Sequence, residues 1–218
     1  SRNRMKYKWP LMKKSITTLD KLGLCSFILF NDRFSKGRLV REAEHQWAKW
    51  LGVKYAVFVN SGSSANLILV DALKELHGLS EGDEVLVPAC TWSTNIAPLL
   101  QMKLKPVFCD ITFDNFSFDE SRLQQISQTN NIKAIFVTHL LGLPSDIDAL
   151  RRIFPDALII EDCCESHGAE YGGKKVGTLG EGSSFSFYYG HHMTSIEGGM
   201  ACTDNYCACH AALDGGHM

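Results

Sequence analysis

Four short segments of the chain carry residue types that could perform chemistry, and the first is a serine-rich turn. Ser61, Gly62, Ser63 and Ser64 follow an apolar run and precede a helical pattern. Backbone N–H groups and the helix dipole favour an anion at the start of a helix, and a phosphate group fits such a turn best. A helix that is simply capped by serine explains the same residues equally well. The segment therefore predicts either a phosphate site or a plain cap.

Two further segments place functional side chains where apolar runs end. The run Ile159-Ile160 is followed directly by Glu161 and Asp162. Acids rarely end a buried strand unless one of them meets a cation or a donor. We therefore expect Asp162 either to hold a protonated ring nitrogen or to cap the next loop. Trp92 follows another apolar run, and it offers either a flat face for a planar ring or ordinary core packing.

The fourth segment contains two adjacent histidines, His191 and His192, between an aromatic run and a Glu-Gly-Gly sequence. Neighbouring side chains of an extended chain point in opposite directions, which makes the pair a poor chelate for a metal ion. We expect one histidine to act as a base near neutral pH and the other to pack. The Cys-Ala-Cys-His sequence at 207–210 is a weak zinc signal, and a frayed terminus explains it better. No metal site is predicted.

These segments need a scaffold that brings strand ends together, and the pattern along the chain predicts one. Short β-rich apolar runs alternate with helical periodicity, and several runs are apolar on both faces, as in strands covered by helices on each side. The alternation predicts an α/β fold, a three-layer α/β/α domain with a mostly parallel seven-stranded sheet. Ligands of such sheets bind at the carboxyl ends of the strands. The expected strands are Tyr55–Asn60, Glu84–Pro88, Pro106–Ile111, Lys133–His139, Ala157–Asp162, Ser184–Tyr188 and Met200–Thr203, and the expected helices are Arg41–Leu51, Ser64–His77, Ser93–Met102, Asp119–Ser127 and Asp146–Phe154.

Composition narrows the class of protein. The 218 residues carry a formal net charge of -2, without the clustered positive charge that nucleic-acid binding needs. No secretory signal and no apolar run of about 20 residues is found, so neither secretion nor a membrane span is expected. The eight cysteines are not spaced as a disulfide framework, and Cys90 and Cys109 are expected to be small buried residues. A reduced, cytoplasmic location is favoured.

In this order, the segments resemble those of the DegT/DnrJ/StrS sugar aminotransferase family, from about residue 10 to residue 204. The resemblance implies the large domain of fold type I pyridoxal 5'-phosphate enzymes. It also implies roles for individual residues. Gly62, Ser63, Ser64 and Ser186 would hold the cofactor phosphate, Trp92 would stack on its ring, Asp162 would pair with the ring nitrogen, and Glu165 would lie near the ring. His139, Gly142, Pro144 and Asp146 fit the HLxGxPxD loop of the family.

The chain departs from the family at the lysine that binds the cofactor covalently. Counting along the SFxxxK segment from Ser186 places His191 at that position, whereas Lys174 and Lys175 lie in a turn before the strand. A histidine in place of this lysine marks the 3-dehydratase branch. The resemblance therefore implies that His191 is the catalytic base and that the cofactor works as pyridoxamine 5'-phosphate. The reaction would remove the C3 hydroxyl of a nucleotide-linked 4-keto-6-deoxy sugar, in deoxysugar or lipopolysaccharide biosynthesis.

The same resemblance implies partners and a domain organisation. An amino donor such as glutamate, or an iron–sulfur reductase, would restore the cofactor, and the functional unit would be a homodimer. Residues 1–40 would form an N-terminal arm, 41–204 the cofactor-binding large domain and 205–218 an atypical tail, with the small C-terminal domain of the family absent. Two alternatives stay open: a sugar-nucleotide aminotransferase, which needs a lysine at the site, and a truncated remnant that binds the cofactor without catalysis.

Overall fold

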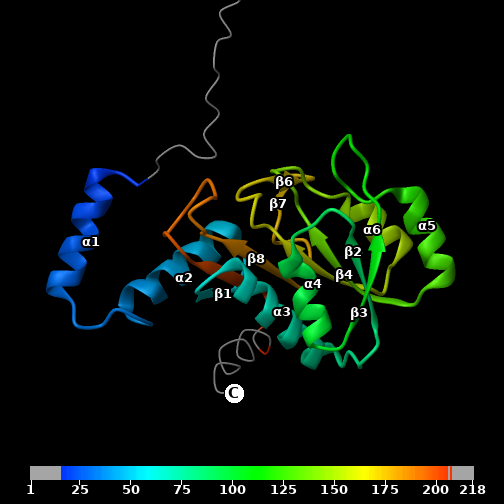
Figure 1. The fold of residues 1–218 in the computed structure, drawn as a ribbon, viewed down its shortest axis with the longest axis horizontal. Coiled ribbons are helices and arrows are strands. Elements are labelled where there is room, and N and C mark those ends of the chain that lie inside the picture. Colours follow the sequence, from blue (N-terminus) through cyan, green and yellow to red (C-terminus); the bar gives the residue numbers. More distant parts are fainter. Residues whose placement is uncertain (1–15, 206, 208–218) are drawn as a thin grey trace, which may run out of the picture.

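Seven strands form a single mixed sheet in the computed structural model, which describes residues 16–205 and 207 (Figure 1). The strand order is β1-β9-β8-β5-β4-β2-β3, and β9 runs antiparallel to both of its neighbours while the other pairs are parallel. This arrangement confirms the predicted seven-stranded, mostly parallel sheet. The elements are α1 (Thr18–Phe30), α2 (Arg38–Leu51), β1 (Tyr55–Val59), α3 (Gly62–His77), β2 (Glu84–Pro88), α4 (Ser93–Gln101), β3 (Lys105–Cys109), α5 (Glu120–Thr129), β4 (Ile132–Thr138), α6 (Ile147–Ile153), β5 (Leu158–Asp162), β6 (Glu170–Tyr171), β7 (Lys174–Lys175), β8 (Gly182–Ser186) and β9 (Gly199–Thr203).

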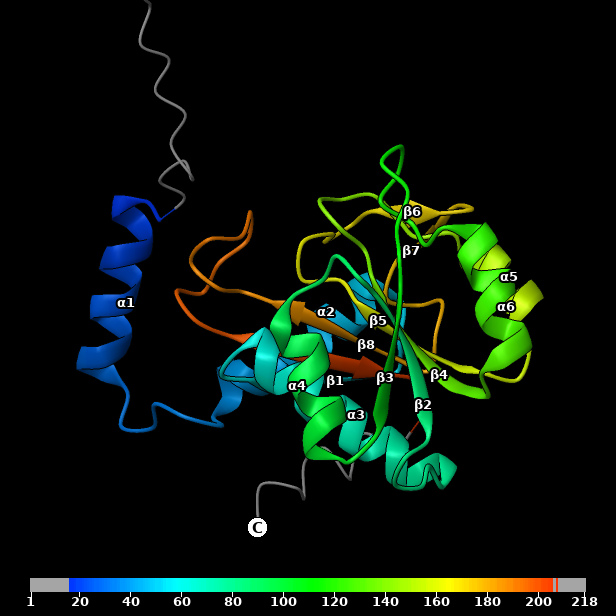
Figure 2. The same ribbon diagram turned by 45° about the vertical axis from the view of Figure 1, so that its right-hand side comes forward.

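Helices cover both faces of the sheet because neighbouring strand residues point in opposite directions. In β2, Val85 and Val87 pack with α3 and α4, whereas Leu86 packs with α5 and α6 on the other face. A third cluster joins α2 to β8 and β9 through Leu51, Phe185 and Met200, among other residues. Figure 2 shows α3 and α4 in front of the sheet and α5 and α6 beside its other face. The three layers bring the carboxyl ends of the parallel strands to one edge.

Every expected helix and strand is present, and its two ends lie within three residues of the predicted ends. The prediction omitted two features of the structure. The two-residue strands β6 and β7 form a separate hairpin. Lys174 and Lys175, which we expected in a turn, are therefore strand residues. One burial prediction is also wrong: Cys109 is buried, but Cys90 is exposed because it lies in the loop after β2 rather than within the strand.

The second omission is α1, a helix that buries none of its residues. Both views show it standing clear of the α/β body (Figures 1 and 2). Thr17 and Asp20 form a capping box at its start, and exposed apolar side chains such as Leu29 and Phe30 cover its surface. Residues 1–15 of the expected arm, and residues 208–218 with most of the Cys-Ala-Cys-His sequence, lie outside the described residues. In the part of the chain that is described, no helix is both long and apolar enough to cross a membrane.

Candidate active site

A cavity of about 610 Å³ opens at the carboxyl ends of β2, β4, β5 and β8. Its lining comes from five separate stretches of the chain: the start of α3, the loop before α4, the end of β4, the loop after β5, and the segment after β8. The topology explains this convergence, because each crossover connection returns the chain to the same edge of the sheet. The lining residues are Ser61, Gly62, Ser63, Trp92, Thr94, Thr138, His139, Leu140, Asp162, Cys164, Glu165, Ser186, Tyr188, Gly190, His191 and Glu197.

The serine-rich turn forms one end of the cavity. The side chain of Ser61 caps α3 by accepting the Ser64 N–H at 3.1 Å. The N–H groups of Gly62 and Ser63, in contrast, have no acceptor among the described residues, and they belong to the first turn of the helix, where the dipole favours an anion. The glycine is required by space, because a Cβ atom at Gly62 would lie 2.7 Å from the Cβ of Ser186 and 2.9 Å from the sulfur of Cys164.

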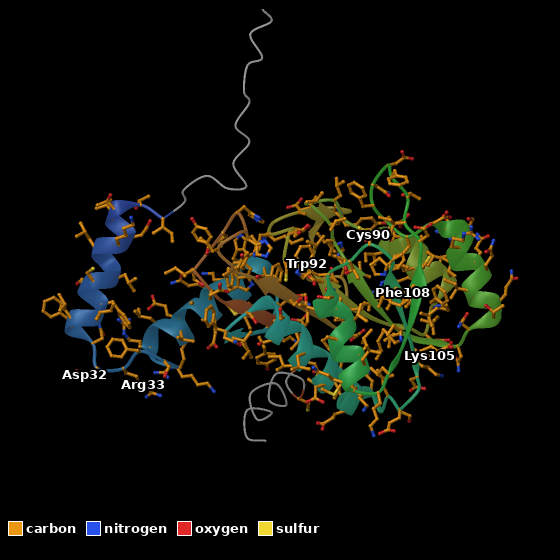
Figure 3. All side chains as sticks on the ribbon, viewed as in Figure 1. Asp32, Arg33, Cys90, Trp92, Lys105 and Phe108 are labelled. Carbon is orange, nitrogen blue, oxygen red and sulfur yellow. The ribbon has the colours of Figure 1, made fainter. Side chains whose placement is uncertain are left out.

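Asp162 and Trp92 lie at the ends of neighbouring elements. Asp162 is the last residue of β5, is 4% exposed, and accepts the Cys164 N–H at 2.9 Å and an amide N–H of Asn66 at 3.1 Å. Trp92 is the N-cap residue of α4 and is 66% exposed. Figure 3 shows Trp92 and Cys90 near the upper end of the sheet, away from Lys105 at the start of β3. The cavity therefore has a carboxylate at its floor and an aromatic face at its rim.

His191 enters the cavity from the segment between β8 and β9. Its backbone N–H donates to the Tyr188 carbonyl at 3.0 Å, which fixes the turn that carries the ring. Burial lowers the pKa of His191 below its ordinary value of 6.5, although the carboxylate of Glu165 acts in the opposite direction. The Glu165 carboxylate is itself held by the Leu141 N–H at 3.1 Å. A neutral imidazole at this place is able to accept a proton near neutral pH.

Behind the cavity wall, Glu161 is completely buried and is the centre of a hydrogen-bond network. One carboxylate oxygen accepts the N–H groups of Leu179 at 2.7 Å and Gly180 at 2.8 Å. The other accepts the Gly177 N–H at 2.7 Å and the Nε2 of His139 at 2.9 Å. These four donors compensate for the loss of water around the charge. The network ties β5 to the end of β4 and to the turn before β8.

The Nε2–H tautomer of His139 follows from its second nitrogen, because Nδ1 accepts the Ser145 N–H at 3.1 Å. His139, Glu161 and Cys163 have potential ligand atoms within 4.8 Å of one another. A metal ion would have to displace hydrogen bonds that already saturate Glu161 and His139. Burial also raises the pKa of the Cys163 thiol well above its ordinary 9.0, which opposes the thiolate that a metal needs. The cluster therefore has a structural role.

The residues of the cavity fit pyridoxal phosphate. Two unpaired N–H groups, with the hydroxyls of Ser63 and Ser186 beside them, form a cradle that only glycine at position 62 leaves open. The carboxylate of Asp162 would hold a protonated ring nitrogen, and Trp92 offers a face for the ring. Lysine is absent from the described residues that line the cavity. The Nζ of Lys175 donates to the Trp50 carbonyl at 2.6 Å, and neither residue lines the cavity.

The structure brings all of the predicted site residues to the cavity except Ser64, whose N–H and hydroxyl both bond to Ser61. Sequence reasoning missed several lining residues. Ser61 belongs to the predicted serine-rich turn but was given no role of its own at the cofactor, and Thr94 lies two residues after Trp92. Glu197 belongs to the Glu-Gly-Gly sequence that marked a functional loop. Asn66 gave no signal, because its partner Asp162 is 96 positions away in the sequence.

Comparison with known proteins identifies relatives of the chain. Residues 19–212 match the model of the DegT/DnrJ/EryC1/StrS aminotransferase family. The chain is 38% identical over 201 residues to GDP-4-keto-6-deoxy-D-mannose 3-dehydratase of Escherichia coli O55:H7. The aligned region covers 90% of this chain and 51% of that protein. It is 35% identical to GDP-perosamine synthase of Escherichia coli O157:H7, over 92% of this chain and 54% of that one.

A solved structure of GDP-4-keto-6-deoxymannose-3-dehydratase with a trapped PLP-glutamate geminal diamine has a TM-score of 0.87 to this fold at 36% identity. The superpositions on two solved 3-dehydratase structures cover 93–94% of this chain and 53–54% of those chains. The chain thus spans about half the length of the relatives it matches. Structural relatives of this fold bind pyridoxal phosphate.

Proposed function

Because the chain belongs to the DegT/DnrJ/EryC1/StrS aminotransferase family, we propose that it is the cofactor-binding part of a sugar-nucleotide 3-dehydratase. The substrate would be a nucleotide-linked 4-keto-6-deoxy sugar that loses its C3 hydroxyl. One observation carries the proposal: the cavity that fits the cofactor contains His191 and is lined by no lysine among the described residues. Imidazole forms no stable imine with an aldehyde, whereas it exchanges protons readily near neutral pH.

Each side chain has a part in this reaction. When bound, pyridoxamine phosphate supplies an amine that condenses with a ketone and a ring that accepts an electron pair. Asp162 would keep a proton on the ring nitrogen, and the start of α3 would hold the phosphate. His191 would take a proton from the carbon that bears the amine and deliver it to the C3 hydroxyl, which would leave as water. The lowered pKa of His191 supports this role, because the free base predominates at neutral pH.

The partners of the reaction are also proposals. The name of the E. coli relative supports a GDP-linked 4-keto-6-deoxymannose, and the PLP-glutamate adduct in the solved relative supports glutamate as the amino donor. Glutamate would return an amine to the cofactor and leave as 2-oxoglutarate. Over one cycle the sugar loses one oxygen as water, the amine is released as ammonia, and the two electrons come from glutamate.

We also propose that the functional unit is a homodimer. Several apolar side chains of α1, among them Leu19, Ile28 and Phe30, are more than half exposed in the isolated chain. Exposed apolar surface of this extent typically marks an interface. Size-exclusion chromatography with light scattering measures the mass directly, and a monomer at micromolar concentration would contradict the dimer.

Borohydride reduction tests the role of position 191. After incubation with pyridoxal phosphate and reduction, peptide mass spectrometry should find no cofactor fixed to a lysine of the wild-type chain. His191→Lys should gain one fixed cofactor per chain at position 191. The matched control is His192→Lys: the neighbouring side chain is exposed and does not line the cavity, so no fixed cofactor is expected there. Cofactor fixed to a lysine of the wild type would refute the histidine-base mechanism.

The product separates dehydration from amination. With pyridoxamine phosphate, glutamate and the GDP-linked keto sugar, the 3-dehydratase yields a sugar that has lost one oxygen. An aminotransferase yields a sugar in which an amine replaces the keto oxygen. A chain that binds the cofactor and forms neither product is a non-catalytic remnant, and the proposed function would then be wrong for this chain.

A further inference from the structure

Asn66 is an unexpected residue for the place that it occupies. It lies in the second turn of α3, is 1% exposed, and is surrounded by helix and sheet packing. Its side-chain nitrogen donates to the carboxylate of Asp162 at 3.1 Å and to the backbone carbonyl of Thr94 at 3.4 Å. Both acceptors lack hydrogens to donate, so they fix the orientation of the amide. The side-chain oxygen of Asn66 is consequently buried without a hydrogen-bond partner among the described residues.

An orphaned buried oxygen lowers the stability of the fold, whereas an apolar side chain of similar size would not. The side chain at this position therefore lowers stability, and among the described residues Asp162 is the charged group to which Asn66 is hydrogen-bonded. Together with the Cys164 N–H at 2.9 Å, the amide of Asn66 places one donor on each oxygen of the carboxylate. The carboxylate cannot rotate without losing one of the two hydrogen bonds, and Asp162 lines the cavity.

The position of Asn66 on α3 gives this contact a second consequence. Gly62 and Asn66 are four residues apart, so they lie on the same face of the helix, about 6 Å apart along its axis. The first turn of the helix presents the anion cradle, and the next turn holds the acid at the cavity floor. One rigid element therefore sets the relation between the two ends of the cavity.

We propose that Asn66 is a positioning residue, which holds Asp162 in the orientation required to pair with the ring nitrogen of the cofactor. The inference rests on the proposed cofactor site and deepens it by adding a residue that contacts the acid rather than the ligand. Asn66→Leu removes the donor and the orphaned oxygen together. Asn95→Leu is the matched control, because Asn95 is also fully buried with an unpartnered oxygen, but its nitrogen faces Thr138 at 3.5 Å instead of Asp162.

The first measurement needs no cofactor. Amide hydrogen exchange of Cys164, followed by NMR, reports how firmly the Asp162 carboxylate is held. We expect the Cys164 N–H to exchange about tenfold faster in Asn66→Leu than in the wild type, and at an unchanged rate in Asn95→Leu. Only Asn66→Leu removes a hydrogen bond to the charged carboxylate of Asp162. If Asn66→Leu does not fold, Asn66→Ala serves in its place. Equal exchange rates in the two variants would overturn the proposal.

The second measurement uses pyridoxal phosphate. Loss of the oriented carboxylate should weaken its binding about tenfold and lower by about one unit the pH at which the absorbance of the bound cofactor titrates. Asn95→Leu should leave both values unchanged. A wild type that binds no pyridoxal phosphate would refute the proposed function while leaving the exchange measurement to decide on Asn66. Cofactor binding and titration that are identical in Asn66→Leu and the wild type would refute the positioning role.

Discussion

Replacing Glu161 by glutamine should destabilise the fold far more than the loss of one charge suggests. Each carboxylate oxygen accepts two N–H donors, and one oxygen becomes an NH₂ group in the variant. Two of the four donors then face another donor and lose their acceptor. A hydrogen bond to a charged group contributes about 1.5–3 kcal/mol, so the expected loss is about 3–6 kcal/mol. That is a large part of the roughly 5–15 kcal/mol that stabilises a typical domain.

Thermal unfolding followed by circular dichroism measures this loss. For a domain of this size, about 3–6 kcal/mol corresponds to a decrease in Tm of roughly 6–24 °C. Glu165→Gln is the control, because the neighbouring acid accepts only the Leu141 N–H and is partly exposed, and its Tm should change by about 2 °C or less. Equal, small shifts in the two variants would show that the four donors do not stabilise the fold through Glu161.

Two further predictions concern packing and pH. Gly62→Ala should cost about 1–3 kcal/mol by overpacking against Ser186 and Cys164, and should weaken pyridoxal phosphate binding because the cradle closes; unchanged Tm and Kd would contradict the close approach. Burial, together with the charges of the neighbouring histidines, lowers the pKa of His167 from 6.5 to about 3, so the unfolded chain binds this proton first as the pH falls. Stability from this group is therefore complete above pH 6.5 and falls by about 1.4 kcal/mol per pH unit towards pH 3. Urea unfolding at pH 7 and pH 5 should show a smaller difference for His167→Phe than for the wild type, and equal differences would refute the assignment.

The fold could be predicted from the sequence because its signals are local. The segments Glu84–Pro88 and Leu158–Asp162 have apolar residues on both faces, as buried parallel strands require. Once the strands are known, the rule that ligands bind at their carboxyl ends brings Gly62, Trp92 and Asp162 to one edge of the sheet. Helix α1 was missed although Thr17 and Asp20 form a capping box that signals a helix start, because its apolar residues are not confined to one face and none of them is buried by the described residues.

The polar network behind the cavity could not be predicted, because its partners are distant in the sequence. Glu161 is 22 positions from His139 and accepts the backbone N–H groups of Gly177, Leu179 and Gly180, which lie 16 to 19 positions away. A strand ending in two acids indicated that one of them meets donors. Only the structure shows that the first acid is enclosed by protein donors and that the second faces the cavity.

Position 191 lies on a different segment from the residues that fit the cofactor. Those residues belong to α3, the start of α4, β5 and the end of β8, and the described hydrogen bonds of the Asp162 carboxylate do not involve His191. His191 lies instead in the segment between β8 and β9, held at its backbone by the Tyr188 carbonyl. A side chain in such a segment can be exchanged without disturbing the scaffold. In the proposed mechanism, the scaffold therefore determines which cofactor binds, and the residue at position 191 determines whether an amine is transferred or a hydroxyl is lost.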